Sequence, residues 1–230
     1  MYPSLLVLEV GVTGHPQLDM LIGDVPWSWI IEFYGDEGIL RYLLHHTLAY
    51  YSRHWKTLLF HTVDFGGIDP YLLQRLARIM KGSLENIHVS RGFRIGDVVA
   101  GLSSQSLRNY DVVILAYPYF HIPGDPRSYG EASRITALIK RLSQTDKRII
   151  IFNTRSKIGT YKPDGGSFHH HTVHVIVELV EKTSGWVTAR LFKHPWKPAG
   201  ARTFFRIREA GAEKPWVVQH RLSEWLSIKN

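Results

Sequence analysis

The residues from Tyr34 to Tyr42 have the outline of a phosphate-binding loop, a motif that binds a nucleotide and supports its hydrolysis. A working loop has Gly, four further residues, Gly-Lys and then Ser or Thr. Gly35 takes the first glycine position, and the positions after the four-residue spacer are occupied by Leu40, Arg41 and Tyr42. The sequence therefore keeps the frame of the motif but replaces the residue types on which its chemistry depends.

Each replacement removes a specific contribution to phosphate binding. Leu40 places a branched side chain where a glycine would let backbone N–H groups approach the phosphates. Arg41 keeps the charge but is bulky and planar, and the Tyr42 oxygen cannot replace a short hydroxyl on Mg²⁺. Because one lost electrostatic group typically costs about 3–4 kcal/mol of transition-state stabilisation, we expect no hydrolysis of ATP or GTP and no cofactor. ATP binding without turnover stays open, as does an anion at the Gly35–Gly38 turn, since helix N-termini attract anions.

The sequence around this loop alternates between strand-like and helix-like patterns. Residues 28–34 predict a strand, and apolar residues between Ile39 and Tyr51 recur at helical spacing. Further elements are predicted at 4–8, 57–63, 70–80, 87–90, 97–106, 111–116, 131–142 and 148–153, followed by strands at 174–179, 186–192 and 203–208. This order predicts an α/β fold with a mostly parallel central sheet flanked by helices and a C-terminal antiparallel β extension. No linker interrupts it, so we expect one domain over residues 1–230.

The composition excludes several classes of protein. With no cysteine in 230 residues, the chain has no disulfide, no thiolate-held iron–sulfur cluster and no thiolate zinc site. The apolar run near Met1 is too short for a signal peptide or a membrane helix, so we expect a cytoplasmic protein without a membrane partner. Residues 1–64 have a charge balance of −4, whereas the remaining residues have a balance of +12. The basic part indicates a polyanionic partner or, alternatively, ordinary solubility charge.

Four short stretches, in order along the chain, match the motifs of one known family. They are Thr13-Gly14 with Leu18-Asp19 and Leu21-Ile22-Gly23, the strand Ile31–Gly35, the segment Glu85–Arg91, and Pro163-Asp164-Gly165-Gly166 followed by His171. Through these stretches the chain resembles the core of the RecA/RadA recombinases, especially the short archaeal RadB- and KaiC-like members. Their order and spacing agree from residue 10 to about residue 208.

The resemblance implies a RecA-like P-loop NTPase core without the helical N-terminal domain of full-length recombinases. It also places two more residues of the family's nucleotide site. The Asp that binds Mg²⁺ at the end of the second nucleotide strand (Walker B) falls at Ala116, and the catalytic Glu falls near Asp64. With the altered loop (Walker A), these departures imply a pseudo-ATPase rather than an enzyme.

Two loops of the resembled family face single-stranded DNA, and the corresponding segments here are 117–130 and 154–162. Both mix aromatic and basic side chains, the combination that stacks on bases and neutralises phosphates. The resulting DNA-contact candidates are Arg127, Tyr129, Arg155, Lys157, Tyr161 and Lys162. In the alternative interpretation, Tyr119 and Phe120 pack against the sheet and Arg127 caps a turn. A second basic stretch, from Arg190 to Arg208, either extends this surface or is a solvated face.

The histidines do not predict a metal site. In a strand, His169 and His171 of the run 169–171 would point to one face, and three imidazoles can bind a divalent ion. The nearest carboxylates in sequence, Asp164 and Glu178, have no recognised ligand spacing to the run, so we expect no metal. The pair His45-His46 is predicted to lie on a helix surface.

These observations favour a non-catalytic recombinase paralogue that acts as an accessory factor in homologous recombination or DNA repair and binds single-stranded DNA. One alternative is a pseudo-ATPase that pairs with an active RadA-type recombinase or a homologous paralogue, and another is a KaiC-like signalling protein. Without the N-terminal domain we expect a monomer or dimer rather than a filament. DNA binding by the isolated protein favours the first interpretation, and retained nucleotide binding favours the last.

Overall fold

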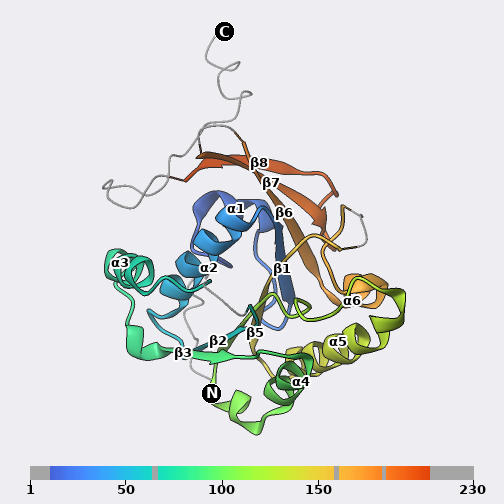
Figure 1. The fold of residues 1–230 in the computed structure, drawn as a ribbon. Helices are drawn as coiled ribbons and strands as arrows, with labels where there is room; N and C mark the ends of the chain where they lie inside the picture. The colour runs from blue at the N-terminus through green and yellow to red at the C-terminus, as the bar shows by residue number, and fades with distance from the viewer. Residues whose placement is uncertain (1–10, 64–66, 158–160, 183–184, 208–230) are drawn as a thin grey trace, which may run out of the picture.

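One eight-stranded sheet runs through the residues that the computed structural model describes, 11–63, 67–157, 161–182 and 185–207 (Figure 1). Its strands are β1 (Ile30–Gly35), β2 (Thr57–His61), β3 (Ile87–Arg91), β4 (Val112–Ala116), β5 (Arg148–Asn153), β6 (Val175–Glu181), β7 (Trp186–Lys193) and β8 (Arg202–Arg206). Their spatial order is β3-β2-β4-β5-β1-β6-β7-β8. The first six in this order pair in parallel, while β7 and β8 pair antiparallel. The strand predicted at 4–8 lies outside the described residues.

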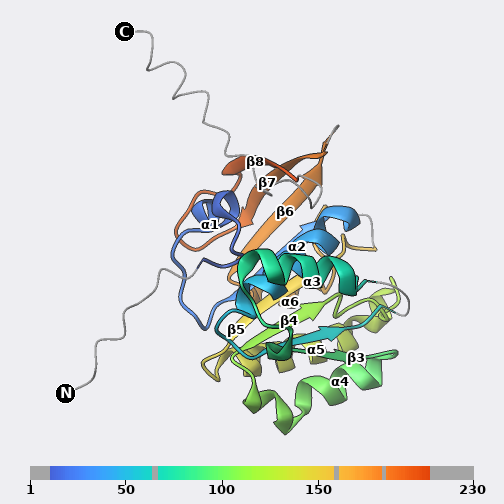
Figure 2. The ribbon, with the colours of Figure 1, turned by 90° about the vertical axis from the view of Figure 1, so that its left-hand side faces the viewer.

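Helices cover both faces of this sheet (Figures 1 and 2). One face carries α1 (Pro16–Ile22), α2 (Glu37–Tyr51) and α3 (Pro70–Met80), and the other carries α4 (Ile95–Ser103), α5 (Tyr129–Ser143) and α6 (Gly166–Thr172). Short 3₁₀ helices lie in the connections, at Leu84–Asn86, Gln105–Asn109 and Pro126–Ser128. The predicted α/β class, with a mostly parallel sheet and a C-terminal antiparallel extension, is confirmed. Among the described helices, none has the length and apolar character needed to cross a membrane.

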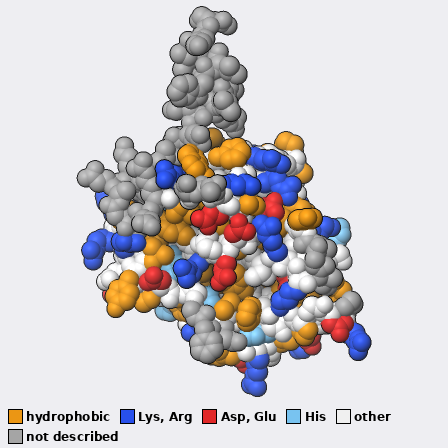
Figure 3. Space-filling model, turned by 45° about the horizontal axis from the view of Figure 1, so that its top comes forward, with side chains coloured by type: hydrophobic (Ala, Val, Ile, Leu, Met, Phe, Trp, Pro, Cys, Tyr) orange, Lys and Arg blue, Asp and Glu red, His pale blue; other side chains and the backbone are white. Residues whose placement is uncertain are grey.

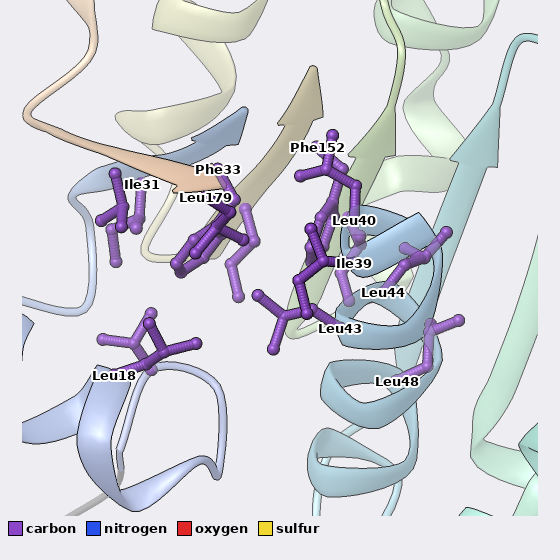
Figure 4. Close-up of a cluster of buried hydrophobic side chains, with 14 of the residues drawn as sticks. Leu18, Ile31, Phe33, Ile39, Leu40, Leu43, Leu44, Leu48, Phe152 and Leu179 are labelled. Atoms are coloured by element: carbon purple, nitrogen blue, oxygen red, sulfur yellow. The ribbon is translucent and has the colours of Figure 1, made fainter. Parts of the chain in front are cut away.

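The core on the α2 side of the sheet fixes the position of that helix (Figure 4). The part of this core that comes from α2 includes five large aliphatic side chains at helical spacing, Ile39, Leu40, Leu43, Leu44 and Leu48. These side chains pack toward β1 and β5, where the rings of Phe33 and Phe152 are stacked with centroids 5.6 Å apart. Because this face of α2 is fully buried, the start of the helix is held at the carboxyl end of β1.

Helix α1 has no counterpart among the predicted elements, because its segment mixes turn residues with isolated apolar residues. Pro16 opens the helix, a favoured position for proline because the first helical N–H has no partner to lose. The Asp19 carboxylate accepts hydrogen bonds from the Thr13 backbone N–H (2.8 Å) and from the Thr13 hydroxyl (2.9 Å). Gly14 has a φ of 75°, which favours glycine. The Thr-Gly and Leu-Asp motif therefore closes a compact turn onto α1.

The prediction that His45 and His46 lie on a helix surface is wrong, because both imidazoles are fully buried. The Nδ1 atom of His45 donates to the Arg41 carbonyl (2.6 Å), and its Nε2 atom accepts from the Asp69 backbone N–H (2.7 Å). His46 donates through Nδ1 to the Thr13 carbonyl (3.1 Å). Burial lowers the pKa of both side chains, so both are neutral near pH 7 and join α2 to its neighbours.

Candidate functional site

The connection between β1 and α2, where a phosphate-binding loop would lie, is a direct strand-to-helix turn. The strand ends at Gly35 and the helix begins at Glu37, so Asp36 is the single residue between them. Gly35 has a φ of 140°, and a Cβ there would lie 1.9 Å from the Leu179 carbonyl oxygen. The Asp36 N–H donates to the same oxygen (3.1 Å). Glycine at position 35 is therefore explained by the close approach of β1 and β6.

Negatively charged side chains surround the start of α2. Asp36 accepts hydrogen bonds from the Glu181 backbone N–H (2.8 Å) and from the Arg155 guanidinium (3.3 Å), and Glu37 lies in the first helical turn. A helix N-terminus attracts anions through its unpaired N–H groups, and here Asp36 and Glu37 place two acidic side chains at that end of the helix, without a side-chain cap hydrogen bond. A phosphate at this turn would meet two like charges.

The three altered motif residues lie within α2 rather than in a loop. Leu40 is only 1% exposed and points into the core (Figure 4), so its side chain does not occupy the space above the turn as predicted. The difference arises because the helix begins three positions before residue 40. Arg41 is exposed, and Tyr42 is half-buried with its pKa raised by burial.

The residues at the end of β4 make close contacts with the end of β2. Ala116 is fully buried, and the Thr62 hydroxyl donates to the carbonyls of Ala116 and Tyr117. Tyr117 has a φ of 61°, a conformation that costs about 1–2 kcal/mol for a residue with a side chain. Its ring lies edge-on to His61, with centroids 5.9 Å apart, and burial raises its pKa to about 12. The rings of His61 and Tyr117 therefore pack against each other at the ends of β2 and β4, and Asp64 lies outside the described residues.

Two of the predicted DNA-contact cations are engaged in contacts within the protein. The Lys157 ammonium donates to the carbonyls of Phe120 (2.6 Å) and Ile122 (2.7 Å), so it fastens segment 154–162 to segment 117–130. The Arg155 guanidinium lies 3.3 Å from the Asp36 carboxylate and 3.9 Å from the Glu178 carboxylate. Both side chains hold the loops in place, whichever ligand the loops bind.

The other four candidates reach solvent. The Arg127 side chain is 93% exposed and lies 3.7 Å from Asp125, and Lys162 is also exposed. Tyr161 is 80% exposed and Tyr129 is 43% exposed. The structure therefore brings aromatic and basic side chains from both loops to one edge of the sheet, the edge formed by the carboxyl ends of β4 and β5. Tyr119, in contrast, is buried.

The arrangement of these elements matches that of a solved recombinase. The chain superposes on a crystal structure of the RadB recombinase with a TM-score of 0.65 and 19% sequence identity. The superposition covers 89% of this chain and 97% of the RadB chain. The fold is RecA-like. No protein-family model and no curated protein sequence matches the chain. The resemblance carried by the four sequence stretches is thus confirmed at the level of the fold.

This RecA-like core contains a buried polar network that was not predicted from the sequence. Glu32 on β1 is fully buried, and its Oε1 atom accepts from the Asn153 amide and contacts Nε2 of His169, both at 2.7 Å. The Nδ1 atom of His169 lies 2.8 Å from the Tyr119 hydroxyl, which lies 2.8 Å from the Thr136 hydroxyl. The sequence does contain one indication of this network: Glu32 lies inside the apolar strand Ile30–Gly35, and a buried carboxylate needs a polar partner.

The histidine run belongs to α6 and not to a strand. Its turns point His169 into the core, whereas His171 is exposed, so the two do not share a face. In the described part of the chain, no group of three or more His, Asp or Glu side chains is placed to hold a metal ion.

Proposed function

We propose that this protein is a recombinase paralogue that does not hydrolyse ATP and that binds single-stranded DNA as an accessory factor in recombination or repair. The observation that carries the proposal is the turn at Asp36. Within a RecA-like fold, only Asp36 separates Gly35 from the first residue of α2, Glu37, so no four-residue spacer encloses the position of a phosphate.

The electrostatics of the turn support the absence of hydrolysis. Asp36 and Glu37 oppose a triphosphate, and Ala116 offers no ligand to Mg²⁺. Preorganised positive groups normally supply much of the stabilisation of the transition state in phosphoryl transfer. The guanidinium of Arg155, which reaches the turn, is paired with Asp36.

The exposed side chains of the two loops support DNA binding. Arg127 and Lys162 offer cations for phosphates, and Tyr129 and Tyr161 offer rings on which bases can stack. Base stacking is tolerant of sequence, so we expect weak binding without sequence preference. The positive balance of the chain after residue 64 adds a long-range attraction for the strand.

The proposal is tested by fluorescence anisotropy with a labelled oligonucleotide over a range of salt concentrations. Each phosphate contact contributes about −0.7 to the slope of log affinity against log salt for a single strand. We expect Lys162→Met and Arg127→Met each to flatten the slope by about that amount. Lys140→Met is the matched control, because Lys140 is an exposed lysine in the last turn of α5.

A second assay measures phosphate release from Mg²⁺-ATP. We expect no release above the background of buffer alone. Absence of oligonucleotide binding by the unaltered protein at low salt would reject the DNA-binding part of the proposal. Phosphate release that disappears in an Arg41→Ala variant would reject the non-catalytic part.

A further inference from the structure

A surface hollow of about 430 Å³ lies between Ser156, Lys162, α6, the start of α5 and the end of β7. Its lining includes the side chains of Tyr129, Lys162, Ser167 and Phe192. We call it the Tyr129–Phe192 hollow. Its size falls within the range of pockets that hold small organic groups, about 300–1,000 Å³. It is separate from the turn at Asp36.

The two aromatic walls of the hollow are held in fixed positions. A Cβ added to Gly166 would come within 3.3 Å of two ring atoms of Tyr129, so that ring lies against the start of α6. The ring of Phe192 is held edge-on by Tyr34 (centroids 6.0 Å apart, 89°) and by His170 (6.3 Å, 81°). Two rings fixed before binding offer stacking surface at little entropic cost.

The cations around the hollow divide into structural and exposed ones. The Lys193 ammonium donates to the carbonyls of His170 (2.6 Å) and His171 (3.2 Å), so it closes the end of α6 and is part of the wall. Lys162 also lines the hollow and is exposed. A planar apolar group that carries an anionic substituent therefore fits the hollow best, with its ring between the walls and its anion at Lys162.

From Phe192 a basic and aromatic surface continues across the antiparallel extension. The Arg190 guanidinium lies 5.9 Å from the centroid of the Phe192 ring, and Arg190 is the cross-strand partner of Arg202. Phe204 and Arg206 follow on the same face of β8, where all three β8 side chains are exposed. We call these four residues, Arg190, Arg202, Phe204 and Arg206, the β7–β8 face.

The opposite face of the extension is closed. Val187, Ala189 and Leu191 of β7 and Phe205 of β8 are buried in the core that contains α1. Figure 3 brings this end of the molecule forward and shows Lys and Arg side chains among hydrophobic ones beside the grey C-terminal residues. The alternation along β8 therefore separates a core face from a face that presents cations and a ring at about 7 Å intervals.

We propose that a nucleic-acid single strand places one unstacked base in the Tyr129–Phe192 hollow and continues across the β7–β8 face. The inference rests on the proposed DNA-binding function and names a path for the strand. Single-stranded nucleic acid is the ligand that alternates planar rings with anions at short intervals, and the hollow and the face repeat that alternation. A free nucleotide would use the hollow alone and would gain nothing from Arg202 or Arg206.

The test compares variants in equilibrium binding of an oligonucleotide that carries 2-aminopurine, whose fluorescence reports stacking. Phe192→Leu keeps an apolar side chain but removes the ring, and we expect affinity to fall about 5- to 150-fold. The matched control is Tyr71→Leu, because Tyr71 is an 82% exposed ring on α3, on the other side of the sheet. Arg202→Met should flatten the salt slope by about 0.7.

Two further measurements keep the inference testable if Phe192→Leu folds poorly. Ser167→Trp introduces a large side chain at an exposed position of the hollow, so it should block the base without altering the core. An abasic oligonucleotide should bind the unaltered protein about as weakly as the normal oligonucleotide binds the Ser167→Trp variant.

The outcomes separate this inference from the proposed function. If the unaltered protein binds oligonucleotides but Phe192→Leu, Ser167→Trp and the abasic strand leave the affinity unchanged, the path is wrong and the proposed function stands. If no oligonucleotide binds at low salt, both are wrong. A third outcome combines two results: dAMP competes with the oligonucleotide only when Phe192 is present, and Arg202→Met has the same salt slope as the unaltered protein. Together they would assign the hollow to a free nucleotide and reject the proposed path of the single strand.

Discussion

Restoring the phosphate-loop motif by the triple change Leu40→Gly, Arg41→Lys and Tyr42→Thr should destabilise the protein without creating an ATPase. Leu40 is 1% exposed and packs in the core, and it lies inside α2. Truncation of a buried leucine to alanine typically costs about 2–5 kcal/mol, and glycine instead of alanine inside a helix adds about 1 kcal/mol. Leu40→Gly alone is therefore expected to cost about 3–6 kcal/mol, a large share of a typical stability of about 5–15 kcal/mol.

Denaturant unfolding followed by far-UV circular dichroism measures this loss. The matched control is the double variant Arg41→Lys and Tyr42→Thr, which keeps Leu40 and should lose about 1–2 kcal/mol because Tyr42 is only half-buried. Neither variant should release phosphate from Mg²⁺-ATP, since Asp36 and Glu37 remain at the start of the helix. A triple variant that is as stable as the double variant, or one that hydrolyses ATP, would refute the argument from the early start of α2.

Three other perturbations have definite expected results. Lowering the pH from 7 to 5 should destabilise the fold, because burial lowers the pKa of His15 to about 2 and of His46 to about 3. Below pH 6.5 these two side chains bind protons in the unfolded chain but not in the folded chain, which lowers the free energy of unfolding by about 2 kcal/mol for each side chain at pH 5. Unfolding curves at several pH values measure this decrease. Asp19, whose pKa burial raises to about 6, offsets part of this loss. Lys157→Met should increase protease cleavage in segment 117–130, because the ammonium joins that segment to its neighbour; equal cleavage rates would contradict this. Glu32→Leu should lower the free energy of unfolding by about 1–3 kcal/mol because it leaves an N–H of the buried Asn153 amide without its acceptor, and an unchanged denaturation midpoint would count against it.

The order of strands and helices could be predicted because burial leaves a clear pattern in those segments. The strands Val112–Ala116 and Arg148–Asn153 are buried on both faces and show almost continuous apolar runs. Helix α6 left no such pattern, because it is short and its segment Gly166–Thr172 contains a single apolar residue. It is held by the contact between His169 and Glu32, residues 137 positions apart, which no local pattern reveals.

The residue types of the candidate site could be predicted, but their partners could not. In the sequence, Arg155 and Lys162 are equivalent as candidate phosphate ligands. In the structure, Arg155 pairs with Asp36, 119 positions away, whereas Lys162 is exposed. The role of the β7–β8 face could not be predicted for the same reason. The alternation along β8 shows that its residues divide between two faces, but only the burial of Phe205 in the core shows which face is exposed.

The turn at Asp36 is also joined to segments 117–130 and 154–162, for which we propose DNA contact. Asp36 accepts a hydrogen bond from Arg155 of segment 154–162, and the Tyr34 hydroxyl, at the end of β1, donates to the Tyr161 carbonyl (2.9 Å). Lys157 then carries the connection into segment 117–130. Each of these contacts joins two groups of the protein directly. We therefore expect oligonucleotide affinity to be the same with and without Mg²⁺-ATP in the anisotropy assay, and to fall in Asp36→Asn, which weakens the pair with Arg155. An affinity that rises with ATP would mean that the turn still recognises the nucleotide and that these contacts are not the ones that position the loops.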